Sequence, residues 1–313
     1  MRISGGFLSV FLFLAASGQS GSQESPPSET PANFTVAMIG DQGLGKDARA
    51  VLRLIKSEGA QAVLHQGDFD RTDNPAAWEQ MIDEVLGPDF PYFGTLGNQD
   101  VLEWEGKSGY QERLKNRMNR QGLAWDGDLG VKSSFHYKGL FLLQVSPGLR
   151  SGDHAGYLRE QLKSDKSLWR IASWHETMRL MQVGEKGDET GWDVYEEARQ
   201  GGALIATAHE HSYSRSHLLA SCKNQEVADD SKSLTLTRGK TFVVVSGLGG
   251  STIRPQLLTG KWWASIYTQS QGATYGAFFG VFNAGGTPNR AKFYFKNIKG
   301  DIVDRFEVVS EVK

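Results

Sequence analysis

The fold of this chain is indicated above all by a set of polar residues that each follow a short apolar run. There are six of them, at five places: Asp41, Asp68, Asn98, His175, and His209 with His211. In an open α/β sheet the functional site lies outside the carboxyl ends of the strands, so chain topology would gather these side chains in one crevice. Each has an ordinary alternative, as a turn aspartate, a bend asparagine or a core histidine. Six such residues along one chain favour a common site.

The apolar runs alternate with helical patterns in the first third of the chain. Strands are predicted at residues 34–39 and 62–65, and helices at 47–58 and 75–86. This βαβα order predicts a largely parallel sheet. Further strands are predicted at 134–145 (a hairpin around 138–139), 169–173, 204–207, 242–245 and 291–309 (a pair joined at 299–301). The predicted fold class is therefore mixed α/β, or α+β.

The chemistry of the six side chains is that of a two-metal hydrolase. Carboxylate and amide oxygens together with imidazole nitrogens suit divalent ions, and one carboxylate can bridge two of them. Two such ions activate a water, and the resulting metal hydroxide could attack phosphorus.

Several motifs in this order resemble the calcineurin-like metallophosphoesterase superfamily: Gly40-Asp41-Gln42-Gly43, Gly67-Asp68, Gly97-Asn98, His175 and His209-Glu210-His211. The stretches HEHSYSR at 209–215 and VVVSGLGGS at 243–251 look most like the purple acid phosphatase branch. The resemblance covers a domain at 33–311. It implies a double β-sandwich flanked by helices, with the metal site at the carboxyl ends of strands.

The resemblance also implies two divalent ions, whether Zn, Mn, Fe or Mg, and assigns ligands to each. Asp68 would bridge both ions. The first ion would further bind Asp41 and His211, and the second Asn98, His175 and His209. Through the ions, Asp68, Asn98 and His175 would act in catalysis, and Asn98 would also bind substrate.

One departure from the family pattern is Gln99, which stands where the family carries a catalytic histidine near the leaving group. Glutamine can donate a hydrogen bond to a phosphoryl oxygen but has no proton to transfer near neutral pH. We therefore expect attenuated activity, with good leaving groups least affected.

A second departure is Arg71, at the place of the tyrosine that binds ferric iron in the purple branch. A ferric tyrosinate centre is therefore not expected. Gly43 replaces a histidine that some members use, so the first ion should bind more weakly than the second. Asp70 or Gln42 could supply a further oxygen or be turn residues. Arg71 could clamp a phosphate, or instead pair with Asp70 or Asp73 on the rim.

Several further residues near the motifs could have either a functional or a structural role. We expect His65 to be a scaffold residue, while His154 could replace the missing acid and His217 could support a metal ligand. The loop at 176–190 could form a substrate wall. Residues 261–263 could offer an aromatic face, or be core residues.

The N-terminus has the pattern of an export signal. Arg2 precedes an apolar run at 7–16, and small residues follow at 16–18, so residues 1–18 are predicted as a cleaved signal peptide and the chain as secreted or periplasmic. Residues 19–32 are rich in Ser, Pro, Gly and Glu and are predicted as a disordered linker. The only cysteine is Cys222, so no disulfide forms within the chain.

Charge and hydropathy limit the classes of partner that the chain is expected to bind. The formal net charge of -2 and the pI of about 6.4 do not favour a nucleic acid duplex as partner. The apolar run at 7–16 is too short to span a bilayer, so no stable membrane span is expected. The expected partner is a small-molecule phosphate ester, by default a phosphomonoester. The alternative is a non-catalytic member that binds one metal, a phosphate-bearing ligand or a protein. The sequence leaves the oligomeric state open.

Overall fold

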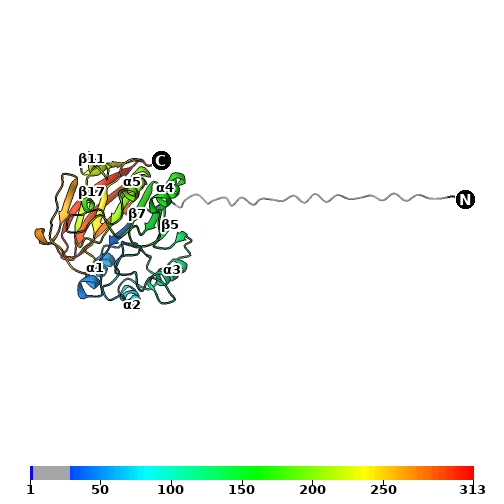
Figure 1. Ribbon diagram of the computed structural model, residues 1–313, viewed down its shortest axis with the longest axis horizontal. Coiled ribbons are helices and arrows are strands. Elements are labelled where there is room, and N and C mark those ends of the chain that lie inside the picture. Colours follow the sequence, from blue (N-terminus) through cyan, green and yellow to red (C-terminus); the bar gives the residue numbers. More distant parts are fainter. Residues whose placement is uncertain (3–28) are drawn as a thin grey trace.

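The computed structural model describes residues 1–2 and 29–313 (Figure 1). The predicted signal segment and most of the predicted linker lie outside the described residues. They therefore stay predictions. Within the described part of the chain, no helix has both the length and the apolar character needed to cross a membrane.

Two large sheets form the body of the protein. The first has seven strands in the order β12-β17-β16-β15-β1-β2-β3. Its bounds are β1 Phe34–Ile39, β2 Ala62–His65, β3 Tyr92–Gly94, β12 Ser233–Leu236, β15 Gly276–Phe282, β16 Arg290–Asn297 and β17 Ile302–Ser310. The strands β1, β2 and β3 run parallel, as the alternating pattern predicted.

The second sheet has eight strands in the order β14-β9-β13-β8-β7-β6-β5-β4. Its bounds are β4 Asp126–Asp128, β5 Lys132–Tyr137, β6 Leu140–Val145, β7 Trp169–Ser173, β8 Leu204–Thr207, β9 Tyr213–Ser216, β13 Val243–Ser246 and β14 Trp263–Tyr267. A small separate ribbon joins β10 Leu218–Ser221 to β11 Glu226–Asp229. The strands β6, β7, β8 and β13 are parallel.

Helices flank both sheets. Packed with the first sheet are α1 Lys46–Ser57, α2 Pro75–Val85 and α3 Tyr110–Arg120, and packed with the second are α4 His154–Ser164 and α5 Trp192–Gln200. The short 3-10 helices are η1 Arg179–Met181, η2 Gln269–Gln271 and η3 Ala284–Gly286. Figure 1 shows α1, α2 and α3 grouped along one side of the molecule, apart from α4 and α5. The predicted double β-sandwich with flanking helices is confirmed.

Aromatic side chains hold the two sheets together. Trp169 of β7 meets Phe282 of β15 edge to face at 5.2 Å between ring centroids. Phe242, just before β13, meets Phe293 of β16 at 5.4 Å. All four rings are buried, and burying one phenylalanine contributes roughly 1.5–3 kcal/mol. The sandwich is therefore an apolar core shared by both sheets.

The carboxyl ends of the parallel strands meet where the two sheets touch. The N–H of Gly40, just after β1, donates to the carbonyl of Ser246 at the end of β13 at 2.9 Å. A Cβ on Gly40 would lie 2.3 Å from the Cβ of Ala208, so only glycine allows this approach. The residues that follow β1 and β8 are thereby brought face to face.

Candidate metal centre

The structure brings the six predicted ligand residues to this junction. Three follow strands of the first sheet and three follow strands of the second: Asp41 after β1, Asp68 after β2, Asn98 after β3, His175 after β7, and His209 and His211 after β8. Asp41, Asp68 and His209 have positive φ of 55°, 56° and 66°. Non-glycine residues rarely adopt this conformation, and it concentrates at functional sites.

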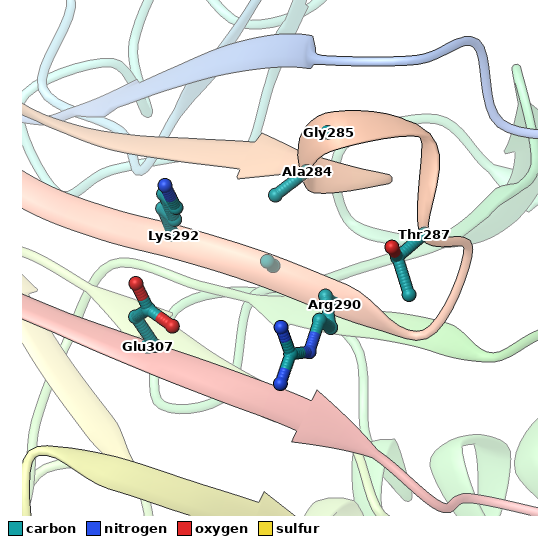
Figure 2. A pocket seen from close by; sticks show the side chains of 7 residues that line it. Ala284, Gly285, Thr287, Arg290, Lys292 and Glu307 are labelled. Carbon is teal, nitrogen blue, oxygen red and sulfur yellow. The ribbon is translucent and has the colours of Figure 1, made fainter.

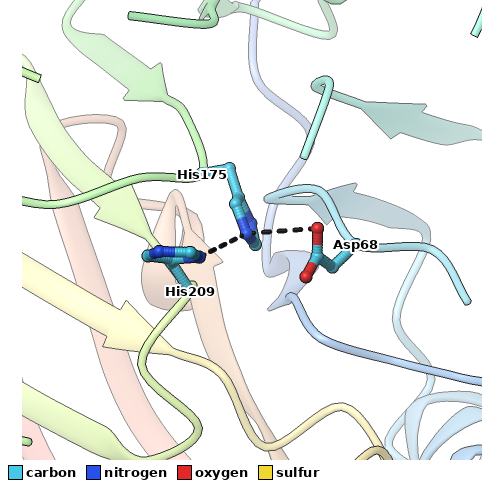
Figure 3. A group of neighbouring side chains, drawn as sticks. All are labelled: Asp68, His175 and His209. Atoms are coloured by element: carbon cyan, nitrogen blue, oxygen red, sulfur yellow. Dashed lines mark hydrogen bonds and ion pairs between the residues drawn. The ribbon is translucent and has the colours of Figure 1, made fainter. Parts of the chain in front are cut away.

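His175 is the centre of the predicted second-ion group. Its Nδ1 lies 2.6 Å from the carbonyl oxygen of Gln66, which can only accept, so Nδ1 carries the proton. In the neutral ring Nε2 is then a lone pair. It lies 3.2 Å from Asp68 Oδ1 and 3.0 Å from His209 Nδ1 (Figure 3). It also lies 3.0 Å from Asn98 Oδ1.

Acceptor atoms thus converge on one point inside the protein. His175 is fully buried, and burial alone would lower its pKa, but the charge of Asp68 and its hydrogen bond raise that pKa to about 10. Such a point needs a positive charge, which a proton or a metal cation can supply. Two oxygens and two imidazole nitrogens are a donor set that fits a divalent ion.

Asp41 and His211 form a separate pair, as expected for the first ion. His211 Nε2 lies 3.2 Å from Asp41 Oδ1, which has no hydrogen-bond partner within the described residues. Asp41 Oδ2 accepts the backbone N–H of His209 at 2.9 Å, and Thr252 Oγ1 contacts His211 Nδ1. Burial raises the pKa of Asp41, but the imidazole of His211, together with those of His175 and His209, holds that pKa below its usual range.

The two ion sites differ in how many donors the protein supplies. Asp68, His175 and His209 offer atoms that all lie within 4.8 Å of one another. Over residues 1–2 and 29–313, no such group of three histidine, cysteine or carboxylate side chains includes Asp41 or His211. That the first ion binds more weakly than the second stays a prediction.

Asp100 is a buried residue that sequence reasoning did not single out. Its Oδ2 accepts the N–H groups of Asp68 and Gly97 at 2.9 and 2.8 Å, and its Oδ1 accepts that of Phe69 at 2.9 Å. Burial and the neighbouring Asp68 raise its pKa. Asp100 fixes the two loops that carry Asp68 and Asn98. Its only signal in the sequence was its place at the end of the Gly97-Asn98-Gln99-Asp100 motif.

The two departures, Gln99 and Arg71, both contact Asp68. The backbone N–H of Gln99 donates to Asp68 Oδ1 at 2.9 Å, and its side chain is exposed. Arg71 Nη1 lies 3.9 Å from Asp68 Oδ2, with 41% of its side chain exposed. The alternative pairing of Arg71 with Asp70 or Asp73 is wrong, because its ion-pair partner is Asp68.

Both residues that could have supplied a further metal oxygen have structural roles. Asp70 accepts the backbone N–H of Thr72 at 2.6 Å and that of Asn74 at 3.1 Å, as a turn residue does. Gln42 Oε1 accepts the hydroxyl of Tyr92 at 2.9 Å. The turn alternative therefore describes Asp70, and Gln42 belongs to a buried hydrogen-bond chain.

The remaining histidines are not drawn into the centre. His65 is buried in β2 and its Nδ1 lies 2.8 Å from the Tyr92 hydroxyl, so the scaffold prediction fits. His154 begins α4, and its Nε2 lies 2.8 Å from the carbonyl of Arg150. A role as the missing acid stays a prediction. His217 lies between β9 and β10, and its Nδ1 has no partner among the described residues.

The loop at 176–190 contributes Glu176 and Glu189, which were not singled out from the sequence. Glu189 Oε2 lies 2.9 Å from His209 Nε2. Glu176, Glu189 and His209 each offer one ligand atom, and these atoms lie within 4.8 Å of one another. Burial and the charge of Glu189 raise the pKa of Glu176 to about 7. The length of the loop indicated a functional wall, but only its folded path shows which residues reach the histidines.

Of the two alternatives for residues 261–263, the core alternative describes Trp263. Trp263 is buried, and Trp262 Nε1 donates to the carbonyl of Leu180 at 3.0 Å. Trp262 therefore fastens the loop at 176–190. An aromatic ligand face at these residues is not supported.

A cavity of about 330 Å³ lies outside this centre. It is formed around η3, β16 and β17, and its polar lining comes from Arg290, Lys292 and Glu307 with Thr287 (Figure 2). None of the six ligand residues lines it. The cavity and the metal centre are separate features.

A cluster of carboxylate, amide and imidazole donors thus lies at the junction of two mixed sheets, and three of its side chains could hold a metal ion. The model of the calcineurin-like phosphoesterase family matches residues 34–213, and the chain belongs to this family. No curated protein matches the sequence.

Solved structures with the same fold are distant in sequence. A purple acid phosphatase from yellow lupin (Lupinus luteus) seeds has a TM-score of 0.66 and 13% identity, over 91% of this chain and 55% of the lupin chain. GAP50, the anchor in the inner membrane complex of Plasmodium, has a TM-score of 0.57 and 12% identity, over 90% of this chain and 91% of the GAP50 chain. The chain thus spans little more than half of the lupin structure.

Proposed function

We propose that this chain is an exported metal-dependent phosphoesterase that hydrolyses small phosphomonoesters, with attenuated activity on poor leaving groups. The observation that carries the proposal is the convergence of Asp68, Asn98 and His209 on Nε2 of His175. Membership of the calcineurin-like family supports phosphoesterase chemistry at such a point.

The protein's own contribution is to hold the donors in place. Divalent ions, when bound, supply positive charge and lower the pKa of a coordinated water. Asp68 is fixed by the N–H of Gln99 at one oxygen, and its backbone is fixed by Asp100. Asn98 is only partly buried, so its amide can reach both an ion and a substrate oxygen. The centre therefore combines rigid ligands with access from solvent.

Gln99 and Arg71 would set the substrate preference. The exposed side chain of Gln99 can donate to a phosphoryl oxygen but cannot protonate a leaving group. Arg71 is exposed on its outer side and within ion-pair range of Asp68, so its guanidinium can bind a phosphate oxygen. Esters with good leaving groups, such as aryl phosphates, are the expected substrates.

The test compares turnover of an aryl phosphate and an alkyl phosphate by chelator-treated protein reloaded with Zn²⁺ or Mn²⁺. Native protein should hydrolyse the aryl ester only after a metal is added. Asp68→Ala should abolish turnover, while Asp89→Ala, at a surface carboxylate that is 80% exposed, should keep it. Metal-independent turnover in the native protein would contradict the proposal.

A second candidate is a binding protein without turnover, and the observation that favours it is the replacement of two family residues by Gln99 and Arg71. GAP50, which shares the fold at 12% identity, is described as an anchor. A native protein that binds Zn²⁺ and inorganic phosphate but hydrolyses neither ester would support this candidate.

Export is proposed from the N-terminal pattern alone. Expression of the full chain in a host with a secretory pathway, followed by N-terminal sequencing of the mature protein, tests it. Cleavage near residue 18 is expected, and an intact N-terminus on intracellular protein would overturn it.

A further inference from the structure

We propose that Glu189 is a positioning residue for the metal centre, because its carboxylate lies 2.9 Å from His209 Nε2 and favours the tautomer with the proton on Nε2, so that the Nδ1 lone pair faces the second ion. The inference rests on the proposed function in that a divalent cation occupies this point.

The two ring nitrogens of His209 have different neighbours. Nε2 lies 2.9 Å from Glu189 Oε2, and Nδ1 lies 3.0 Å from His175 Nε2. An ionised carboxylate offers only lone pairs, so the ring proton belongs on Nε2, the nitrogen that faces the carboxylate. The neutral ring then presents Nδ1 as a lone pair, because one partner sets the role of the other nitrogen.

His175 is fixed in the mirrored way. Its Nδ1 donates to the carbonyl of Gln66, and its Nε2 is the nitrogen left to face the ion site. The two histidines thus turn opposite nitrogens to the same point. His175 is held by backbone from the first sheet, whereas His209 depends on a side chain from a loop.

The loop that carries Glu189 is fastened at several places. The N–H of Glu189 donates to the carbonyl of Thr177 at 3.1 Å, and the N–H of Arg179 donates to Asp188 Oδ1 at 2.9 Å. Trp262 Nε1 holds the carbonyl of Leu180 at 3.0 Å. Glu189 is therefore presented by a structured loop and not by a free surface segment.

The negative charge of Glu189 is a second reason to expect that it supports metal binding. Of the second-ion donors only Asp68 is anionic, since Asn98 and the two neutral imidazoles carry no charge. Glu189 places a further negative charge one ring away from the ion. A carboxylate behind a metal-binding histidine raises the basicity of the ligand, and its loss typically weakens metal binding by about 10–100-fold.

The experiment measures two quantities in the full chain. Nitrogen NMR of the metal-free protein reports the tautomer of His209, and competition with a chelator reports the affinity for Zn²⁺. The variants are Glu189→Ala and Glu189→Gln, with Glu185→Ala as the control on the same loop, at a side chain that is 63% exposed.

We expect His209 to carry its proton on Nε2 in native protein and in Glu189→Gln, whose amide oxygen still accepts. Zn²⁺ affinity should fall by about 10–100-fold in Glu189→Ala, fall less in Glu189→Gln and stay unchanged in Glu185→Ala.

The inference is overturned if native His209 carries its proton on Nδ1, or if Glu189→Ala binds Zn²⁺ as tightly as Glu185→Ala. The first result would mean that His209 turns Nε2 toward a cation shared with Glu176 and Glu189. Should native protein bind no Zn²⁺, the proposed function fails, but the tautomer of the metal-free protein still decides this inference.

Discussion

Two fully buried histidines, one from each sheet, have opposite surroundings. His65, at the end of β2, meets the edge of the Phe69 ring and the hydroxyl of Tyr92. His175, after β7, meets Asp68, Asn98 and His209. Burial lowers the pKa of His65 to about 3, whereas Asp68 overcomes the same burial and raises the pKa of His175 to about 10.

Burial alone therefore does not identify a histidine as a metal ligand. A buried histidine with one neutral partner is satisfied as an uncharged scaffold residue. A buried histidine whose lone pair faces several acceptors needs a positive charge beside it. The difference lies in the groups that surround the ring.

The largest expected effect comes from removing Asp68, which supplies the anionic charge beside His175. In Asp68→Ala the affinity for Zn²⁺ should fall by more than about 100-fold, the upper end for residues that only support a ligand. Hydrolysis of an aryl phosphate should be lost with it. Chelator competition measures the affinity, and retention of native affinity would show that Asp68 is no ligand.

A smaller effect is expected from placing a histidine at the exposed position 99. The variant Gln99→His adds a group that can transfer a proton next to Asp68, so hydrolysis of an alkyl phosphate should rise by about 10²-fold, the low end for a positioned acid. The aryl ester should gain less because its leaving group needs less protonation. An equal gain on both esters, or no gain, would contradict the missing-acid explanation.

The contrast with His65 has a consequence for stability at acidic pH. The unfolded chain binds a proton at His65 below about pH 6.5, whereas the folded protein does so only near pH 3, so stability falls as pH drops through that window. From pH 6.5 to 5 the loss is about 2 kcal/mol.

Urea unfolding of native protein and His65→Gln at both pH values measures how much His65 contributes to this loss of stability. The difference in unfolding free energy between the two proteins should shrink by about 2 kcal/mol at the lower pH. An unchanged difference would mean that His65 is not held neutral.

The smallest effect concerns Arg71, whose charge lies 3.9 Å from Asp68. In Arg71→Tyr the first ion should bind about fivefold more tightly, since a unit charge at 4 Å is worth about 1 kcal/mol in a water-like dielectric. Metal analysis at limiting Zn²⁺ checks this, with Arg290→Tyr in the distant cavity as the matched control. Equal metal content in both variants would reject a role for Arg71 in weakening the first site.

Much of the fold was predictable because short apolar runs between turn residues are a local signal. The strands Phe34–Ile39, Ala62–His65, Trp169–Ser173 and Leu204–Thr207 have the predicted bounds, and α2 ends at Val85, one residue before its predicted end. The convergence of the six ligand residues followed from where those strands end. Residues that are adjacent in the sequence determine where these strands begin and end.

The supporting residues were not predictable in the same way. Asp100 acts by accepting N–H groups about thirty residues back in the chain, and Glu189 acts on a histidine from another strand. Each looks like an ordinary loop acid in the sequence. The partner of Arg71 was misjudged for the same reason, because the side chain turns toward the centre and the nearer carboxylate of Asp70 is already satisfied by its turn.

The most direct test of the central claim, that the lone pairs around His175 hold a divalent cation, is a calorimetric titration of chelator-treated protein with Zn²⁺. Native protein should show one tight binding event and a weaker second one. The tight event should be lost in His175→Ala and kept in His65→Gln. Tight binding that persists unchanged in His175→Ala would contradict the claim.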